Sequence, residues 1–258
     1  MVPKQFLTMV QQAHPSWHVA LTDGLNAVAA ADPSYLPVLS DSTFLPTQGR
    51  LFAAFALPLD RTRYVLIGEG PYPRAASATG VCFMDGAVGS LWSAGGLSKD
   101  VNRATSLRNF MKMLLVAAGQ LQPERTTGDA LVHVAAGALA PGSPFIQTLS
   151  QLQHNLTENG FLLLNAALAF RTDVPPLKEA RAWQPFLKTV FSALAQHAQI
   201  TKQQLPTLVL WGKVAGQVEP MGIAAQFPRA IAEHPYNLSF IINRPMHDLF
   251  GPMQLLTA

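Results

Sequence analysis

The chain has 258 residues, of which 49% are hydrophobic and only 13% are charged. A chain this apolar can bury enough surface to offset the entropy lost on ordering, which excludes intrinsic disorder. The composition also lacks the Glu, Lys and Leu richness of a coiled coil. The net charge of +3 permits nucleic-acid binding without requiring it. The single cysteine, Cys82, excludes a disulfide framework, a cysteine-ligated zinc site and an iron–sulfur cluster.

The apolar pattern predicts helices and short strands in alternation. Apolar positions at helical spacing predict a first helix over Trp17–Ala31, and continuous apolar runs are typical of strands that are buried on both faces. The expected strands are Tyr64–Ile67, Phe161–Leu164, Leu208–Trp211 and the shorter Ala230–Glu233. The helices expected between them are Leu107–Ala118, Phe145–Asn159, with Gly160 as its C-terminal cap, and Trp183–Gln199.

Strands that alternate with helices of this length predict a parallel sheet with right-handed crossovers. The expected fold is therefore α/β, with three α/β/α layers around a central four-stranded parallel sheet, in a single domain over residues 1–258. In an open parallel sheet, ligands bind outside the carboxyl ends of the strands. The residues that follow the expected strands are Gly68–Tyr72, Asn165, Gly212–Lys213 and His234–Pro235. We expect them to form one polar rim.

Two glycine-containing segments lack the motifs of nucleotide-binding loops. After Gly68-Glu69-Gly70, the third glycine of a dinucleotide fingerprint would fall at Pro73. Gly212-Lys213 has neither the upstream glycine nor the following Ser or Thr of a phosphate-binding loop. The seven histidines show no metal-ligand spacing. We therefore expect no cofactor and no metal.

Four segments in order resemble the motifs of the uracil-DNA glycosylase superfamily. They are GEGPYPRAASATGVCF (68–83), LLLNAALAFR (162–171), VLWGKVAGQ (209–217) and EHPYNLSF (233–240). The family-1 enzymes carry GQDPYH, a Gly-hydrophobic-Cys-Phe stretch, LLLN, LLWG and HPSPLS at the corresponding places. Similar residues outside the motifs, such as Ser106-Leu107-Arg108-Asn109, extend the resemblance from about residue 17 to about residue 250, which is the expected core.

The resemblance implies an enzyme that flips uracil or a related base out of DNA and hydrolyses its N-glycosidic bond. By resemblance, Asn165 reads the Watson–Crick edge of the base, Phe83 stacks on it, and Tyr72 excludes thymine. His234 donates a hydrogen bond to the anionic uracil that forms, and Leu238 fills the gap that the flipped nucleotide leaves. The full set of expected site residues is Glu69 and His234 as catalytic, Gly70, Tyr72, Phe83 and Asn165 as substrate-binding, and Leu238, Ser239, Lys213, Arg244 and Ser106 as DNA-binding.

The departures from family 1 leave two interpretations open. Gly70 stands where family 1 has its general-base Asp, and Tyr236 and Asn237 replace a Ser and a Pro of the HPSPLS loop. In the first interpretation Glu69 supplies the carboxylate, as the Glu of the GEAPG loop does in the family-4 glycosylases. In the second, the chain is catalytically inactive and acts as a DNA- or protein-binding module, because a shared fold does not guarantee activity. A resemblance to the poxvirus branch (PYP…GTGV), whose members double as polymerase processivity components, favours the second.

The partner expected under both interpretations is DNA, bound weakly through a few salt-sensitive phosphate contacts. The second interpretation adds a protein partner. The chain is expected to be a monomer, and its apolar runs are too short to span a bilayer. The single cysteine and the absence of an export signal favour a cytoplasmic location.

Overall fold

The computed structural model describes all residues, 1–258, and divides into two compact units. Unit 1 consists of Met1–Met84, Gly160–Leu210 and Val214–Arg229, and unit 2 consists of Asp85–Asn159, Trp211–Lys213 and Ala230–Ala258. Each unit is therefore assembled from three separate stretches of the chain. The single domain over residues 1–258 stays a prediction.

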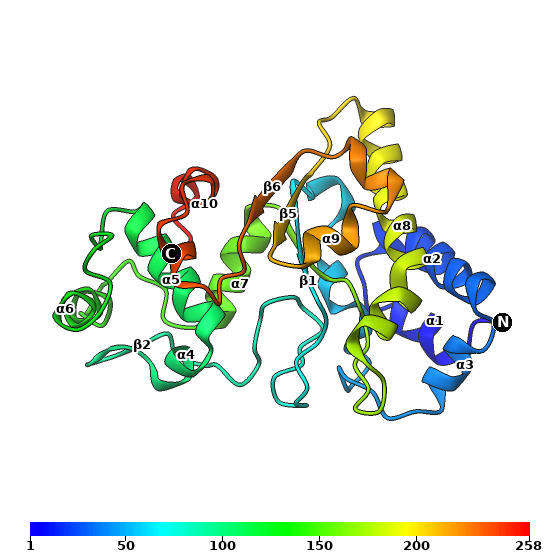
Figure 1. Cartoon of the computed structure of the whole chain (residues 1–258), viewed down its shortest axis with the longest axis horizontal. Helices are drawn as coiled ribbons and strands as arrows, with labels where there is room; N and C mark the ends of the chain where they lie inside the picture. The colour runs from blue at the N-terminus through cyan, green and yellow to red at the C-terminus, as the bar shows by residue number, and fades with distance from the viewer. The chain divides into compact units, whose positions relative to one another are not determined.

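Along the chain, successive groups of helices and strands belong in turn to unit 1 and to unit 2 (Figure 1). Unit 1 contains the helices α1 (Lys4–Val10), α2 (His18–Ala31), α3 (Tyr35–Ser40), α8 (Pro176–Thr201) and α9 (Val214–Val218), and the strands β1 (Tyr64–Gly68) and β4 (Phe161–Asn165). Unit 2 contains the helices α4 (Lys99–Arg103), α5 (Thr105–Ala117), α6 (Asp129–Ala138), α7 (Leu149–Glu158) and α10 (Arg244–Phe250), and the hairpin of β2 (Trp92–Ser93) and β3 (Gly96–Leu97). Strands β5 (Thr207–Trp211) and β6 (Arg229–Ala232) begin in unit 1 and end in unit 2. No helix combines the length and the apolarity that crossing a membrane requires.

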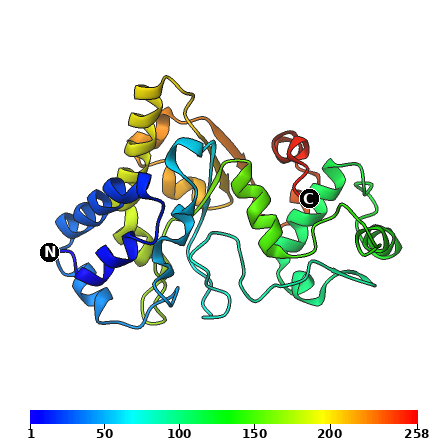
Figure 2. The same ribbon diagram turned by 180° about the vertical axis from the view of Figure 1, so that it is seen from behind.

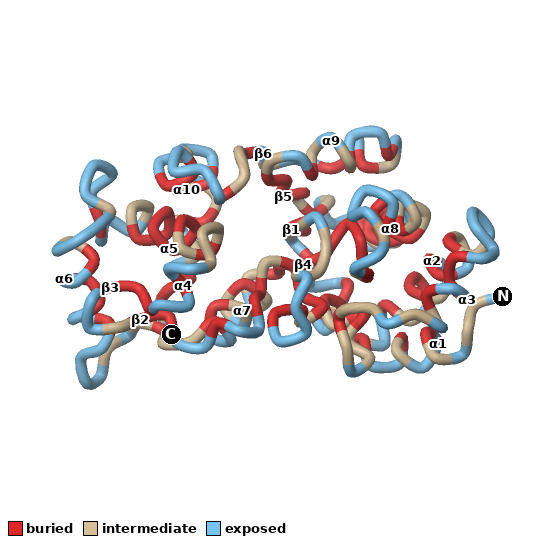
Figure 3. Tube along the Cα trace, turned by 60° about the horizontal axis from the view of Figure 1, so that its bottom comes forward, coloured by how far each residue is buried: buried red, intermediate tan, exposed pale blue.

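The central sheet has the strand order β4-β1-β5-β6, and β1 pairs in parallel with both β4 and β5. The expected α/β class, with a four-stranded parallel sheet flanked by helices, is confirmed. Strands β1, β4 and β5 are almost entirely buried, as expected for strands covered on both faces (Figure 3). The expectation is wrong for β6, where only Ala232 is buried and Ile231 is 47% exposed. It lies at the edge of the sheet, where one side has no neighbouring strand.

Two predicted helices have different boundaries in the structure. The helix expected from Phe145 begins only at Leu149, because Thr148 forms a capping box with Gln151 that fixes the first turn there. It ends at Glu158, one residue before the predicted end, with Asn159 as its C-cap, and Gly160 follows with a positive φ of 83°. The helix expected from Trp183 begins seven residues earlier, at Pro176, since a proline is readily accommodated in the first turn of a helix.

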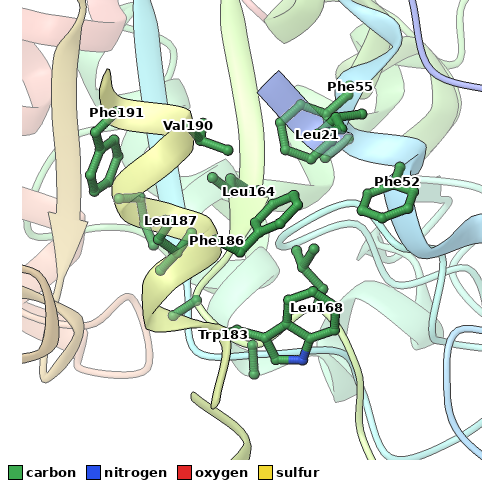
Figure 4. Packing of buried hydrophobic residues seen from close by; sticks show 14 of the residues in the cluster. Leu21, Phe52, Phe55, Leu164, Leu168, Trp183, Phe186, Leu187, Val190 and Phe191 are labelled. Carbon is green, nitrogen blue, oxygen red and sulfur yellow. The ribbon is translucent and has the colours of Figure 1, made fainter. Parts of the chain in front are cut away.

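Helices α2 and α8 pack side by side in unit 1, as both ribbon views show (Figure 1, Figure 2). Their contact surrounds Phe186, whose ring is stacked with Phe52 at a centroid separation of 5.8 Å and meets Trp183 edge-on at 5.5 Å. Leu164 of β4 and Leu168 belong to the same cluster (Figure 4). The apolar core of unit 1 therefore extends directly to the segment that follows β4.

A buried charged network fixes the end of that segment. The Arg171 guanidinium pairs with one carboxylate oxygen of Glu179, at the start of α8, and the Tyr35 hydroxyl donates to the other. All three residues are less than 10% exposed, and the guanidinium lies 5.4 Å from the centre of the Tyr35 ring. Burial, followed by the hydrogen bond to Glu179, raises the pKa of Tyr35. The network satisfies a carboxylate that would otherwise be buried without a counter-charge.

Replacing Arg171 with Met tests the network. The Arg171→Met variant keeps most of the side-chain volume but leaves Glu179 buried and unpaired, so we expect the free energy of unfolding to fall by about 3–5 kcal/mol. Arg181→Met is the matched control, because Arg181 is exposed on α8, the helix that carries Glu179. It should change the free energy of unfolding by less than about 0.5 kcal/mol. Urea unfolding measures both. Equal stability of the two variants would contradict a structural role for the ion pair.

Candidate active site

The carboxyl ends of β1 and β4 meet in register in unit 1. Gly68 pairs with Asn165, the last residue of β4, which is only 4% exposed. Beyond the strands, the Ala166 N–H donates to the Gly68 carbonyl (2.7 Å) and the Ala167 N–H donates to the Glu69 carbonyl (3.1 Å). The Glu69 backbone is therefore held beside the segment that follows Asn165, while the Glu69 side chain is exposed.

Glycine at position 68 is required by a close approach. A Cβ atom there would lie 2.5 Å from the Cys82 sulfur and 3.1 Å from the Asn165 side-chain oxygen. The Cys82 N–H also donates to the Leu163 carbonyl of β4 (3.0 Å), which fixes the 82–83 segment against the strand. Burial raises the pKa of the Cys82 thiol to about 12, so Cys82 is a protonated packing group and not a nucleophile.

Phe83 has a left-handed backbone conformation, with φ of 68°. A residue with a bulky side chain pays on the order of 1–3 kcal/mol for such a conformation and keeps it only where its surroundings enforce it. Thr79 contributes to this enforcement, because its hydroxyl donates to the Met84 carbonyl (2.9 Å) and accepts from the Val81 N–H (3.1 Å). The half-buried Phe83 therefore lies between the two residues, Val81 and Met84, that the Thr79 hydroxyl binds, and directly after Cys82, which contacts β4.

Gly70 differs from Gly68 because it has room for a Cβ atom. A Cβ atom at position 70 would meet only Ala167. It would lie 3.5 Å from the Ala167 Cβ and 3.6 Å from the Ala167 carbonyl oxygen, which are ordinary van der Waals distances. Its φ lies outside the left-handed region, so an L residue would not be strained there. Tyr72, two residues further on, is half-buried. The absence of a carboxylate at position 70 is therefore not imposed by the backbone.

In unit 2, one buried amide holds the loop that follows β6. The Asn109 side chain on α5 is completely buried, and its NH₂ group lies within 3.4 Å of three successive carbonyl oxygens, at 2.8 Å for Pro235, 3.2 Å for Tyr236 and 3.4 Å for Asn237. The loop continues into the 3-10 helix η5 (Leu238–Ile242), where Phe240 and Ile241 are buried. We refer to residues 234–242 as the 234–242 loop.

His234 begins this loop and is half-buried. Its Nδ1 accepts the Tyr236 N–H (3.1 Å), so the proton of the neutral ring is on Nε2, which makes Nε2 a hydrogen-bond donor. Gly212, at the end of β5, has φ of 61°, and a Cβ atom there would lie 2.9 Å from the His234 Cβ. The glycine therefore allows the histidine to approach the β5 terminus.

The expected DNA-binding residues are all in unit 2. Leu238 is 69% exposed, and Ser239, Lys213 and Arg244 are exposed as well, whereas Ser106 is half-buried near the start of α5. Arg244 forms an ion pair with Asp248 (2.9 Å), one helical turn away. Glu69, Gly70, Tyr72, Phe83 and Asn165 all belong to unit 1, and the expected convergence of their side chains with one another and with His234 stays a prediction.

Comparisons with known proteins identify the family. The crystal structure of the wild-type UNG from Nitratifractor salsuginis matches with a TM-score of 0.86 and 36% identity, covering 98% of this chain and 96% of that one. A point mutant of the same protein gives 0.87 and 36%, with 99% of both chains covered. The chain belongs to the uracil-DNA glycosylase superfamily.

Curated sequence relatives of the superfamily match a shorter part. The uracil-DNA glycosylase of Amoebophilus asiaticus is 30% identical over 179 residues, 69% of this chain and 62% of that protein. That of Mycolicibacterium vanbaalenii is 26% identical over 179 residues. The chain spans about three fifths of the length of these two relatives. No protein-family model matches the chain.

Sequence analysis missed the role of Asn109 within this uracil-DNA glycosylase fold. The resemblance already included Ser106-Leu107-Arg108-Asn109, but no role was assigned to the amide. A polar residue on the apolar face of a predicted helix was the available signal, because a buried amide needs hydrogen-bond partners. Lys112, one turn further along α5, is buried too, and burial together with the nearby Arg108 charge lowers its pKa.

Asn109→Ala tests whether the amide positions the 234–242 loop. The variant leaves loop carbonyls without their donor, so we expect stability to fall by about 1–3 kcal/mol and amide hydrogen exchange to accelerate in residues 235–240. Asn102→Ala is the control, because Asn102 lies on α4 and its side-chain NH₂ group donates to the Leu97 carbonyl (2.9 Å). Unchanged exchange in the 234–242 loop of Asn109→Ala would contradict the assignment.

Proposed function

We propose that the chain hydrolyses the N-glycosidic bond of uracil, or of a related base, in DNA after flipping the nucleotide out of the stack. The observation that supports this most directly is the buried Asn165 amide at the end of β4, in register with Gly68 and close to the segment that carries the strained Phe83. A buried amide and an aromatic ring held at one strand end are what recognition of a flipped base requires, namely edge hydrogen bonds and stacking.

In this proposal Asn165 hydrogen-bonds the edge of the base through both its carbonyl oxygen and its NH₂ group. Phe83 stacks on the base, and Tyr72 excludes the methyl group of thymine. His234 stabilises the departing base, because a neutral imidazole with its proton on Nε2 donates a hydrogen bond to an oxygen that gains negative charge. Leu238 occupies the gap in the stack, while Ser239, Lys213, Arg244 and Ser106 contact phosphates.

Glu69 is the group that we propose to supply negative charge. As the base leaves, the sugar becomes cationic, and a carboxylate stabilises that charge and orients the attacking water. The Glu69 backbone is fixed by its hydrogen bond to Ala167, and its side chain is exposed, so it is accessible to solvent and substrate. The family-1 carboxylate is absent at the adjacent position, Gly70.

The second candidate function is a non-catalytic DNA- or protein-binding module. The specific observation in its favour is again Gly70, because the general-base carboxylate of family 1 is missing although the backbone leaves room for it. In this case the base-recognition residues and the 234–242 loop bind DNA without cleavage.

Release of free uracil from a uracil-containing oligonucleotide separates the two functions. We expect the wild-type chain to release uracil, Glu69→Gln to lower kcat by a factor on the order of 10² or more, and Asn165→Ala to lower kcat/KM. Glu124→Gln, which removes an exposed carboxylate from a turn of unit 2, is the matched control and should leave the rate unchanged. No release by the wild type would favour the binding module, and release that survives Glu69→Gln would refute the role of Glu69.

Gly70→Asp tests the missing carboxylate directly. Since position 70 has room for a side chain, the variant should fold and should increase kcat for uracil release by roughly tenfold or more, because a positioned general base contributes at least that much. Gly70→Asn has nearly the same shape without the charge and should not show the increase. If both variants lose activity equally, the side chain itself disturbs the site and the proposal for position 70 fails.

A further inference from the structure

The 234–242 loop presents large side chains to solvent at three positions, Tyr236, Leu238 and Ile242, of which the first two are two residues apart. Tyr236 is 67% exposed and Leu238 is 69% exposed, whereas Pro235 before them and Phe240 after them are buried. Large apolar groups at this level of exposure contribute little to the core of unit 2. Both side chains are therefore accessible to a ligand.

The loop backbone is fixed although these side chains are exposed. Asn109 bonds the carbonyls of Pro235, Tyr236 and Asn237, and the Tyr236 N–H donates to His234. The Asn237 N–H also donates to the His234 carbonyl, which closes a turn. Both the N–H and the C=O of Tyr236 are thus engaged, so its aromatic ring is presented from a rigid backbone. Ordering such a group on binding costs little entropy, since only the side-chain torsions remain to be fixed.

The chemistry of the two side chains differs. Leu238 is aliphatic and has no planar face, so it fills space. Tyr236 has a planar ring, and aromatic rings stack on nucleobases at a gain of several-fold to more than a hundredfold in affinity per base. Two residues apart on one rigid loop, Tyr236 and Leu238 are suited to contact adjacent positions of a nucleic-acid strand.

We propose that Tyr236 is a base-stacking residue that contacts the nucleotide beside the flipped one and favours a purine at that position. This inference rests on the proposed function, because it takes Leu238 as the residue that fills the gap. A purine has two fused rings and offers a larger stacking face than a pyrimidine, so the preference follows from ring area. It makes Tyr236 a determinant of sequence context, separate from recognition of the base itself.

The test uses single-stranded oligonucleotides with one central uracil, flanked on both sides by adenine or by thymine, and measures Kd by fluorescence anisotropy at one fixed salt concentration. We expect the wild type to bind the adenine-flanked strand more tightly. Tyr236→Ala should weaken that binding by roughly 5- to 150-fold and remove the preference. Tyr236→Phe, which keeps the ring and loses the hydroxyl, should retain both. Leu139→Ala, at an exposed apolar position that directly follows α6 and lies outside the 234–242 loop, is the control and should change Kd by less than about twofold.

A second readout reports stacking itself. With 2-aminopurine beside the uracil, its fluorescence should fall on binding to the wild type and to Tyr236→Phe, and should not fall with Tyr236→Ala. Equal affinity of the wild type and Tyr236→Ala for both strands would overturn the proposal, and so would equal losses of affinity in Tyr236→Ala and Leu139→Ala.

Measuring uracil release by the same proteins separates the proposed catalytic function from the proposed stacking role of Tyr236. Purine-dependent binding that requires Tyr236 but is accompanied by no release supports the stacking role and removes the catalytic function. Release at equal rates from both strands by the wild type and Tyr236→Ala, with equal affinities, removes the stacking role and leaves the catalytic function in place.

Discussion

The parallel pairing of β1 with β4 is the constraint on which the unit 1 part of the site depends. It sets Gly68 opposite Asn165, and the absence of a Cβ at Gly68 lets the Cys82 sulfur and the Asn165 amide approach the strand end together. A one-residue slip of register would reverse the faces of every β4 side chain. Because β4 is buried over its whole length, such a slip would also disturb the core on both sides. The position of the Asn165 amide, and with it the base recognition that we propose for this residue, is therefore tied to the stability of the sheet.

Rigidity on both sides of the strand ends has a local energetic cost that the surrounding structure offsets. Phe83 is held in a left-handed conformation by the Thr79 hydrogen bonds and by the Cys82 contact with β4. On the other side, the segment after Asn165 ends at Arg171, whose charge is buried against Glu179. A strained residue and a buried ion pair are tolerated where the packing around them allows no arrangement of lower free energy. Side chains held in this way are preorganised, as a recognition site needs.

The two units contribute different physical means of recognition. Unit 1 holds a buried amide and a strained aromatic ring, which suit discrimination of a single base by shape and hydrogen bonding. Unit 2 holds an exposed loop on a rigid backbone, which suits contact with a strand. Gly70, where the resemblance to family 1 would place an Asp, belongs to unit 1, and the 234–242 loop belongs to unit 2.

Sequence determined what depends on local pattern. The apolar runs of β1, β4 and β5 predicted buried parallel strands, because a strand covered on both faces must be apolar throughout. The same rule failed for β6, since nothing local to that run marks it as the edge of the sheet. The sequence also predicted which residues lie at the strand ends, including Glu69, Asn165 and His234. Their place relative to each strand end depends only on their order in the chain.

Tertiary structure alone decided the contacts between segments that are far apart in the chain. Asn109 meets the Pro235 carbonyl 126 residues away, and Tyr35 meets Glu179 across 144 residues. No periodicity records such pairings, because each depends on where other elements pack. The φ of Phe83 and the space beside Gly70 have the same origin, since both are set by neighbours from β4 and the segment after it. Sequence thus supplied the chemical groups, and packing decided which of them are held in place and which have room to change.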